Sequence, residues 1–160
     1  MDIVWSDILK LLFAVLLGGL IGLEREFRDK TAGFRTVILI CLGAALFTLV
    51  SLSFAPKADP ARIAAQIVTG VGFLGAGAIL RDGARIVGLT TAAIVWLAAA
   101  IGMATGSGNF VLAATATALI ILVLWLFPKI EHWIDNLREV HSYEITGDEN
   151  EGLMQSVEDL

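Results

Sequence analysis

Long apolar stretches alternate with short polar connections along this chain. Crossing ~30 Å of hydrocarbon takes about 20 mostly apolar residues in a helix. Four stretches contain no acidic residue: 8–23, 36–58, 60–81 and 83–130. The first three hold one helix each, and the last is long enough for two, divided by the turn TGSGN at 105–109. The pattern predicts membrane spans at residues 7–23, 36–54, 62–80, 88–105 and 110–127.

The composition agrees with a membrane protein. Hydrophobic residues make up 57% of the 160 residues and charged residues 17%, and the mean hydropathy is +0.81. A soluble domain of this length carries more charge. We therefore expect an all-α integral membrane protein of five transmembrane helices that has the lipid bilayer as its solvent.

The segment TGVGFLGAG at residues 69–77 has three glycines at the spacing G-x-G-x-x-G. In a soluble protein this spacing binds dinucleotides, but only between a strand and a helix that opens into solvent. Here the glycines lie near the middle of an apolar stretch. We interpret the segment as a glycine-rich membrane helix, not a nucleotide site.

Two interpretations of this helix stay open. At about 100° per residue, Gly70 and Gly77 share a face with Gln66 and Arg81, whereas Gly72 and Gly75 lie nearly opposite. Two neighbouring helices could then approach closely, one on each side. Alternatively, the helix is broken near the midplane and its freed carbonyls line an ion or solute path. Gln66 is expected to form an interhelical hydrogen bond, with a substrate contact as the alternative.

The basic residues predict the orientation. They favour one side of the membrane, which by the positive-inside rule is cytoplasmic. That side has Arg25, Arg28, Lys30, Arg35, Arg81, Arg85, Lys129 and Arg138, against Lys10, Lys57 and Arg62 on the other. The N-terminus then lies outside and the C-terminus in the cytoplasm, which five spans satisfy. The N-terminus lacks the basic region of a cleavable signal, so we expect the first stretch to remain as a span.

Charged residues are densest directly after the first span. Three opposite-charge pairs have helical i, i+4 spacing: Glu24 with Arg28, Arg25 with Asp29, and Glu26 with Lys30. One interpretation is a solvated helix face with laterally paired charges. The other is a partner or regulatory contact, because charges at the membrane boundary need partners. From the other connections we nominate Arg35, Arg81 and Arg85 as those partners.

Small residues and helix ends give further expectations. Gly18 and Gly22 form a small-xxx-small pair, which predicts a helix contact within the chain or across a homodimer. Asp59 is expected to cap the third helix, with Pro60 in its first turn and Arg62 one turn before Gln66.

Side chains inside the spans are expected to serve packing. The fourth span opens with Thr90 and Thr91, whose hydroxyls can bond to helix carbonyls. Trp96 lies too deep in that span for an interfacial position, so we expect it to pack. Cys41, the only cysteine, is expected to be a small buried hydrophobic residue.

Three blocks taken together resemble the MgtC/SapB family of bacterial inner-membrane proteins. They are GLEREFRDKTAGFRT at 22–36, DPARIAAQIVTGVGFLGAGAIL at 59–80 and GLTTAAIVWLAAAIGMATGSGNF at 88–110. The resemblance covers residues 7–127. It implies a multi-pass protein of the bacterial inner membrane with five spans and an outside N-terminus, consistent with the charge distribution.

The resemblance also implies a role. Members are associated with adaptation to magnesium limitation and, in pathogens, with virulence through survival inside host cells. In some members the effect is attributed to the F-type ATP synthase or to a magnesium-transporting P-type ATPase, and no enzymatic activity is established. The motif positions carried over are Glu24, Arg25, Glu26, Arg28, Gly33, Arg35, Thr36, Asp59, Pro60, Arg62, Gln66, Gly70, Gly72, Gly75, Gly77, Gly88, Leu89, Thr90, Thr91 and Trp96.

The sequence predicts a membrane domain at 1–127, followed by a C-terminal part that is separate from it. Residues 128–141 have apolar positions on one helical face, which predicts an amphipathic cytoplasmic linker helix. Residues 142–160 resemble the first strand and helix of a small α/β domain of the ACT type found in longer family members. We expect these residues to be poorly ordered and the sequence to be a truncated form.

Two function classes compete. The first is a non-enzymatic regulator, expected to be a homo-oligomer with a dimer favoured, that contacts another membrane protein. The second is a transporter or channel for magnesium or another ion. Magnesium prefers oxygen ligands, usually carboxylates, and no acidic residue falls inside a predicted span after Asp7; whether a metal binds stays open. A hydrolase is disfavoured, because the serines lack an evident acid–base partner. No cofactor and no nucleic-acid partner is expected.

Overall fold

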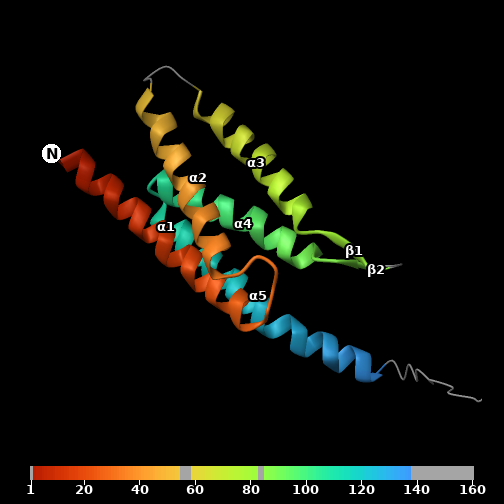
Figure 1. Cartoon of the computed structure of the whole chain (residues 1–160). Helices are drawn as coiled ribbons and strands as arrows, with labels where there is room; N and C mark the ends of the chain where they lie inside the picture. The colour runs from red at the N-terminus through yellow and green to blue at the C-terminus, as the bar shows by residue number, and fades with distance from the viewer. Residues whose placement is uncertain (1, 55–58, 83–84, 138–160) are drawn as a thin grey trace, which may run out of the picture. The chain divides into compact units, whose positions relative to one another are not determined.

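The computed structural model describes residues 2–54, 59–82 and 85–137, and they form five helices and one two-stranded hairpin (Figure 1). In order these are α1 (Asp2–Phe27), α2 (Phe34–Phe54), α3 (Pro60–Gly77), β1 (Leu80–Asp82), β2 (Arg85–Val87), α4 (Leu89–Gly106) and α5 (Phe110–Leu137). The chain divides into two compact units, the first ending at Trp125 and the second beginning at Leu126.

Four of these helices are long and apolar enough to cross a membrane. The candidate spans are Trp5–Phe27, Phe34–Ser53, Leu89–Gly106 and Phe110–Glu131, and the shorter apolar helix Ala61–Gly77 lies between the second and third of them. The prediction of a multi-pass helical membrane protein is therefore confirmed in its general form.

The predicted third span, residues 62–80, extends beyond the end of the observed helix. The helix ends at Gly77, and Leu80 begins an antiparallel hairpin in which it pairs with Val87 and Arg81 pairs with Ile86. Glycines at the end of α3 disfavour helix, whereas Ile86 and Val87 are β-branched and favour an extended backbone. The hairpin is the departure from the all-α fold that was expected.

Helices α3 and α4 differ in the residues that precede their first turns. The predicted cap of α3 is present: the Asp59 side chain accepts a 3.0 Å hydrogen bond from the Ala61 backbone N–H, and Pro60 follows it. Before α4, Gly88 has φ +93°, and a Cβ there would overlap the Ala78 carbonyl oxygen. Glycine is required where the hairpin returns so close to the end of α3.

Helix α2 is packed between α1 and α4 through glycines on both sides. A Cβ on Gly18 would lie 2.9 Å from the Cys41 Cβ, and one on Gly22 would lie 2.9 Å from the Phe34 Cα. The pair predicted from Gly18 and Gly22 therefore makes its contact within the chain. On the opposite side, a Cβ on Gly102 would overlap the Cys41 carbonyl oxygen.

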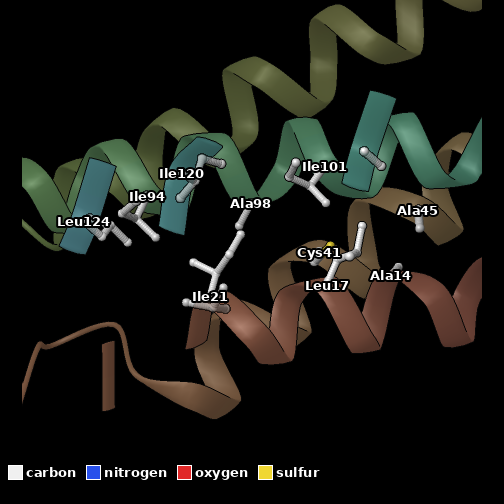
Figure 2. Packing of buried hydrophobic residues seen from close by; sticks show 12 residues of the cluster. Ala14, Leu17, Ile21, Cys41, Ala45, Ile94, Ala98, Ile101, Ile120 and Leu124 are labelled. Atoms are coloured by element: carbon white, nitrogen blue, oxygen red, sulfur yellow. The ribbon is translucent and has the colours of Figure 1, made fainter. Parts of the chain in front are cut away.

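Apolar side chains fill the space between these helices. In Figure 2, Ile21 of α1 points toward Ala98 of α4, and the same buried cluster includes Leu17 of α1 and Ile120 and Leu124 of α5. Cys41 belongs to this cluster and is fully buried, so its predicted role as a small buried hydrophobic residue is confirmed.

Helix α3 lies at the edge of the first unit (Figure 1). It contacts α2 and α4 and contributes Ile67 to a second buried cluster with Ala44 and Ala99. Trp96 of α4 is 50% exposed, so this chain alone does not cover it and its expected packing role stays a prediction. Its position on α4 falls outside the face that meets α1 and α2.

The C-terminal residues form no separate linker helix within the described range. Helix α5 continues from Phe110 to Leu137 with Pro128 inside it, where a new helix was predicted to begin. The unit boundary after Trp125 lies within this helix. Residues 138–141 and the expected start of an α/β domain at 142–160 lie outside the described residues.

Candidate functional site

The last turn of α1 holds two charged side chains inside the protein. Glu24 is 9% exposed and Arg25 is 3% exposed. The Arg25 Nε donates to Glu24 Oε2 over 2.5 Å, and the Arg28 Nε lies 2.7 Å from Glu24 Oε1. We call these three residues the ion triad. It carries one carboxylate and two guanidinium groups, so it has a net positive charge.

One carboxylate oxygen of the triad has no hydrogen bond. Glu24 Oε1 is buried and unsatisfied in the described part of the chain, although Arg28 is within ion-pair distance. The Arg28 Nε–H is therefore not aimed at this oxygen, and the attraction between them is electrostatic only. The guanidinium charge at this distance offsets part of the cost of burying the oxygen.

Only one of the three predicted i, i+4 pairs forms among the described residues. Glu24 pairs with Arg28, but α1 ends at Phe27 and Asp29 has φ +51°. The other two pairs therefore lack helical geometry, and no ion pair joins Arg25 to Asp29 or Glu26 to Lys30 in the described chain. The helix end decides this result, since i, i+4 neighbours face each other only on a continuing helix.

The Glu26 side chain joins the end of α1 to the start of α2 by a hydrogen bond. Its Oε2 accepts a 2.9 Å hydrogen bond from the Phe34 backbone N–H, one of the donors that the first turn of a helix leaves free. A Cβ on Gly33 would overlap this same carboxylate oxygen. The glycine therefore leaves room for the acidic side chain that caps α2.

Replacing Gly33 with alanine should loosen this cap. The new methyl group would displace the Glu26 carboxylate, so the Phe34 N–H would lose its acceptor at a cost of about 1 kcal/mol. Thermal unfolding in detergent measures the effect, with Glu26→Ala as the comparison, and the double variant should be no less stable than either single one. Additive losses would show that Gly33 acts independently of Glu26.

Of the three nominated partners, Arg35 pairs with neither acidic residue in the described part of the chain, and Arg81 and Arg85 stay predictions. Glu24 pairs with Arg25 of its own helix and with Arg28 just after it, Glu26 bonds to backbone, and Arg35 is exposed without an ion pair among the described residues. Arg81 and Arg85 lie in the hairpin, and their side chains are outside the described set.

A hollow beside Glu26 gathers charge at this end of the helices. It has a volume of about 690 Å³ and is lined by Leu23, Glu26, Lys30, Thr31, Gly33, Phe34, Arg35 and Thr36. Thr31 and Thr36 also line a neighbouring hollow with Gly77 and Ala78. The end of α3, and hence the start of the hairpin, therefore lies next to the charged connection.

The glycines of α3 divide differently from the prediction. A Cβ on Gly75 would lie 3.5 Å from the Ala92 carbonyl oxygen of α4, whereas one on Gly70, Gly72 or Gly77 would meet no atom within 4 Å. Within the described part of the chain, one side of α3 is thus occupied. The helix runs unbroken from Pro60 to Gly77, so the broken-helix alternative is not supported.

The remaining predicted site residues are on α3 and α4. Arg62 and Gln66 are exposed, and Gln66 lines an apolar groove between α2 and α3. Thr90 is exposed and Thr91 is buried in the first turn of α4. Within the described residues, no three His, Cys, Asp or Glu side chains gather as a metal site would require.

The sequence reasoning missed the glycines of α4 that contact α2. A Cβ on Gly106 would lie 2.6 Å from the Ala45 carbonyl oxygen, and Gly102 makes the contact with Cys41 described above. The small-xxx-small spacing of Gly102 and Gly106 was a readable signal, the same one that identified Gly18 and Gly22.

Comparison with known proteins assigns the family. The sequence profile of the MgtC family matches residues 11–133, a range that contains the ion triad, α3 and α4. The chain belongs to the MgtC family. No solved structure matches it.

Relatives in this family are similar over most of the chain. "Protein MgtC" of Salmonella typhimurium LT2 is 53% identical over 130 residues, which are 81% of this chain and 56% of that protein. "Putative magnesium transporter YhiD" of Escherichia coli K12 is 49% identical over 131 residues, 77% of this chain and 61% of that protein. "Protein MgtC" of Brucella abortus is 51% identical over 110 residues, 69% of this chain and 46% of that protein. The chain spans about half the length of these family members.

Proposed function

We propose that this MgtC-family protein acts without enzymatic activity, as a bacterial inner-membrane regulator that supports adaptation to low magnesium and, in a pathogen, virulence. It would do so by contacting and modulating another membrane protein. An F-type ATP synthase or a magnesium-transporting P-type ATPase is the proposed partner.

The observation that carries this proposal is that charged side chains gather at one end of the helices, whereas apolar side chains fill the space between them. Between α1, α2, α4 and α5 the buried residues are apolar, apart from Glu24 and Arg25 at the end of α1 and threonines such as Thr105 and Thr117 that donate to carbonyls of their own helices. Charged and polar groups gather instead at residues 24–36. A closed apolar interior with a charged end favours a protein that makes contacts there over one that conducts ions through its core.

The proposed orientation places this charged end in the cytoplasm. With five spans and the N-terminus outside, the ion triad and the hollow beside Glu26 lie at the cytoplasmic boundary, as the positive-inside rule favours. Lys30 and Arg35 are then exposed where the soluble parts of a membrane ATPase could meet them.

Magnesium transport is the second candidate, favoured by the name of the Escherichia coli relative. A measurement of magnesium entry into proteoliposomes separates the two. We expect the purified protein to give no entry above that of empty liposomes. Saturable entry would make the protein a transporter and contradict the regulatory proposal.

Co-reconstitution tests the contact directly. We expect the protein to change ATP-driven proton pumping by an F-type ATP synthase, or ATP hydrolysis by a magnesium P-type ATPase. Lys30→Glu with Arg35→Glu should remove the effect. Arg62→Glu, an exposed charge change at the other end of the helices, is the matched control and should leave it. If neither ATPase responds to the wild-type protein, the proposed partners are wrong.

A further inference from the structure

One face of α3 carries a repeating pattern that no other described part of the chain covers. Ile63, Gln66, Gly70, Phe73 and Gly77 are spaced alternately by three and four residues, and all five are exposed. Phe73 is 81% exposed, and a Cβ on Gly70 or Gly77 would meet no atom within 4 Å. We call these five residues the α3 seam.

The seam is separate from the side on which α3 packs inside the chain. Ile67, Val71 and Gly75 face α2 and α4. At about 100° per residue, they lie roughly a third of a turn from the seam. Spacing by three and four residues is the pattern with which one helix packs along another in a coiled coil. The pattern therefore indicates a helix as the neighbour, from outside this chain.

The seam borders a groove at the depth of the membrane interior. The groove has a volume of about 390 Å³, and Ile63, Gln66 and Gly70 line its α3 wall. Its α2 wall includes Gly43 and Phe47, close to the middle of a 21-residue helix that is long enough to span the membrane. The groove therefore faces hydrocarbon and not water.

The hydrogen-bonding needs of the Gln66 side chain indicate which molecule occupies this groove. Its amide is both a donor and an acceptor, and the described residues give it no hydrogen-bond partner. Lipid tails offer neither donor nor acceptor. A second Gln66 offers both, since each amide can donate to the oxygen of the other.

We propose that two copies of this chain associate through parallel α3 seams, with Gln66 of each copy hydrogen-bonded to Gln66 of the other. Copies that share one membrane orientation are related by a two-fold axis along the membrane normal, which brings each residue to the depth of its counterpart. The bare backbone at Gly70 and Gly77 lets the two helices approach closely. Gly43, where a Cβ would also meet no atom within 4 Å, leaves room for the second α3 in the groove.

Cysteine cross-linking of the purified protein in liposomes tests the interface. Phe73→Cys on the seam should give a disulfide-linked dimer on mild oxidation. Val68→Cys is the matched control: it is 40% exposed on the same helix but points away from the seam, and it should not cross-link. The only native cysteine, Cys41, is fully buried, so the wild-type protein reports the background.

A second change tests the amide pair. In the Phe73→Cys protein, Gln66→Leu should weaken dimerisation about 3- to 30-fold as lipid is added, the range expected for one interhelical hydrogen bond. Gln66→Asn should retain most of the dimer. Gln66 is exposed, so these changes leave the packed core intact.

Each of the other outcomes overturns the proposal. Absence of a dimer at Phe73→Cys would leave the groove to lipid or to a different membrane protein. Equal cross-linking of Phe73→Cys and Val68→Cys would indicate random collision. Dimerisation unaffected by Gln66→Leu would remove the amide pair. None of these measurements involves magnesium or an ATPase, so they are independent of the function proposed above.

Discussion

Replacing Gly102 with alanine should destabilise the helix packing by about 1–3 kcal/mol, the range for a methyl group forced into a filled core. The added Cβ would overlap the Cys41 carbonyl oxygen and lie 2.9 Å from the Ala44 Cβ. Backbone cannot move aside as a flexible side chain can, so α4 must separate from α2. The expected result is a lower midpoint of thermal unfolding in detergent.

The matched control is Gly72→Ala. Both glycines lie within helices, and both changes exchange glycine for the better helix former. A Cβ on Gly72 would meet no atom within 4 Å, so its stability should stay unchanged or rise slightly. Equal stability of the two variants would contradict the close contact between α2 and α4.

These two glycines also show where sequence reasoning stops. Small-xxx-small spacing marks Gly102 as a candidate for a close contact, but Gly72 has the same spacing to Ala76 and open space around it. The G-x-G-x-x-G spacing drew attention to α3, where three of the four glycines at residues 70–77 have open space around them. The tightest contacts with backbone atoms lie at Gly102 and Gly88, because only the three-dimensional packing decides which helix faces meet.

Hydrophobic patterning predicted the helices better than their ends. Length and the absence of acidic residues located all five helices, since burying a backbone in lipid requires a helix. The pairing of β1 with β2 was missed because Ile79, Leu80, Ile86 and Val87 are apolar and continue the pattern of the adjacent helices. Apolar runs this short do not distinguish strand from helix.

The sequence predicted where the charged site lies, but it did not predict which of its residues pair with one another. The sequence located the dense charges after the first span, yet the shortest contact joins the consecutive residues Glu24 and Arg25. Side chains one residue apart on a helix do not normally face each other. Their contact follows from burial, which leaves Arg25 few other groups to bond.

Replacing Glu24 with glutamine should cost about 3–5 kcal/mol, the effect of leaving one member of a buried ion pair without its partner. Arg25 is 3% exposed, so water cannot replace the lost carboxylate. The expected result is a large fall in the unfolding midpoint in detergent. Arg28→Ala is the comparison. The Arg28 side chain is 36% exposed, so solvent screens its pair with Glu24 and the loss should be below about 1 kcal/mol.

Removing both buried charges tests whether the cost comes from the unpaired guanidinium. Glu24→Leu with Arg25→Leu should be more stable than Glu24→Leu alone, because apolar side chains in a packed site need no counter-charge. If the double variant is instead the least stable, Arg25 has another partner in the folded protein. Retained stability combined with loss of the effect on a co-reconstituted ATPase would show that the ion triad serves contact with the partner and not folding.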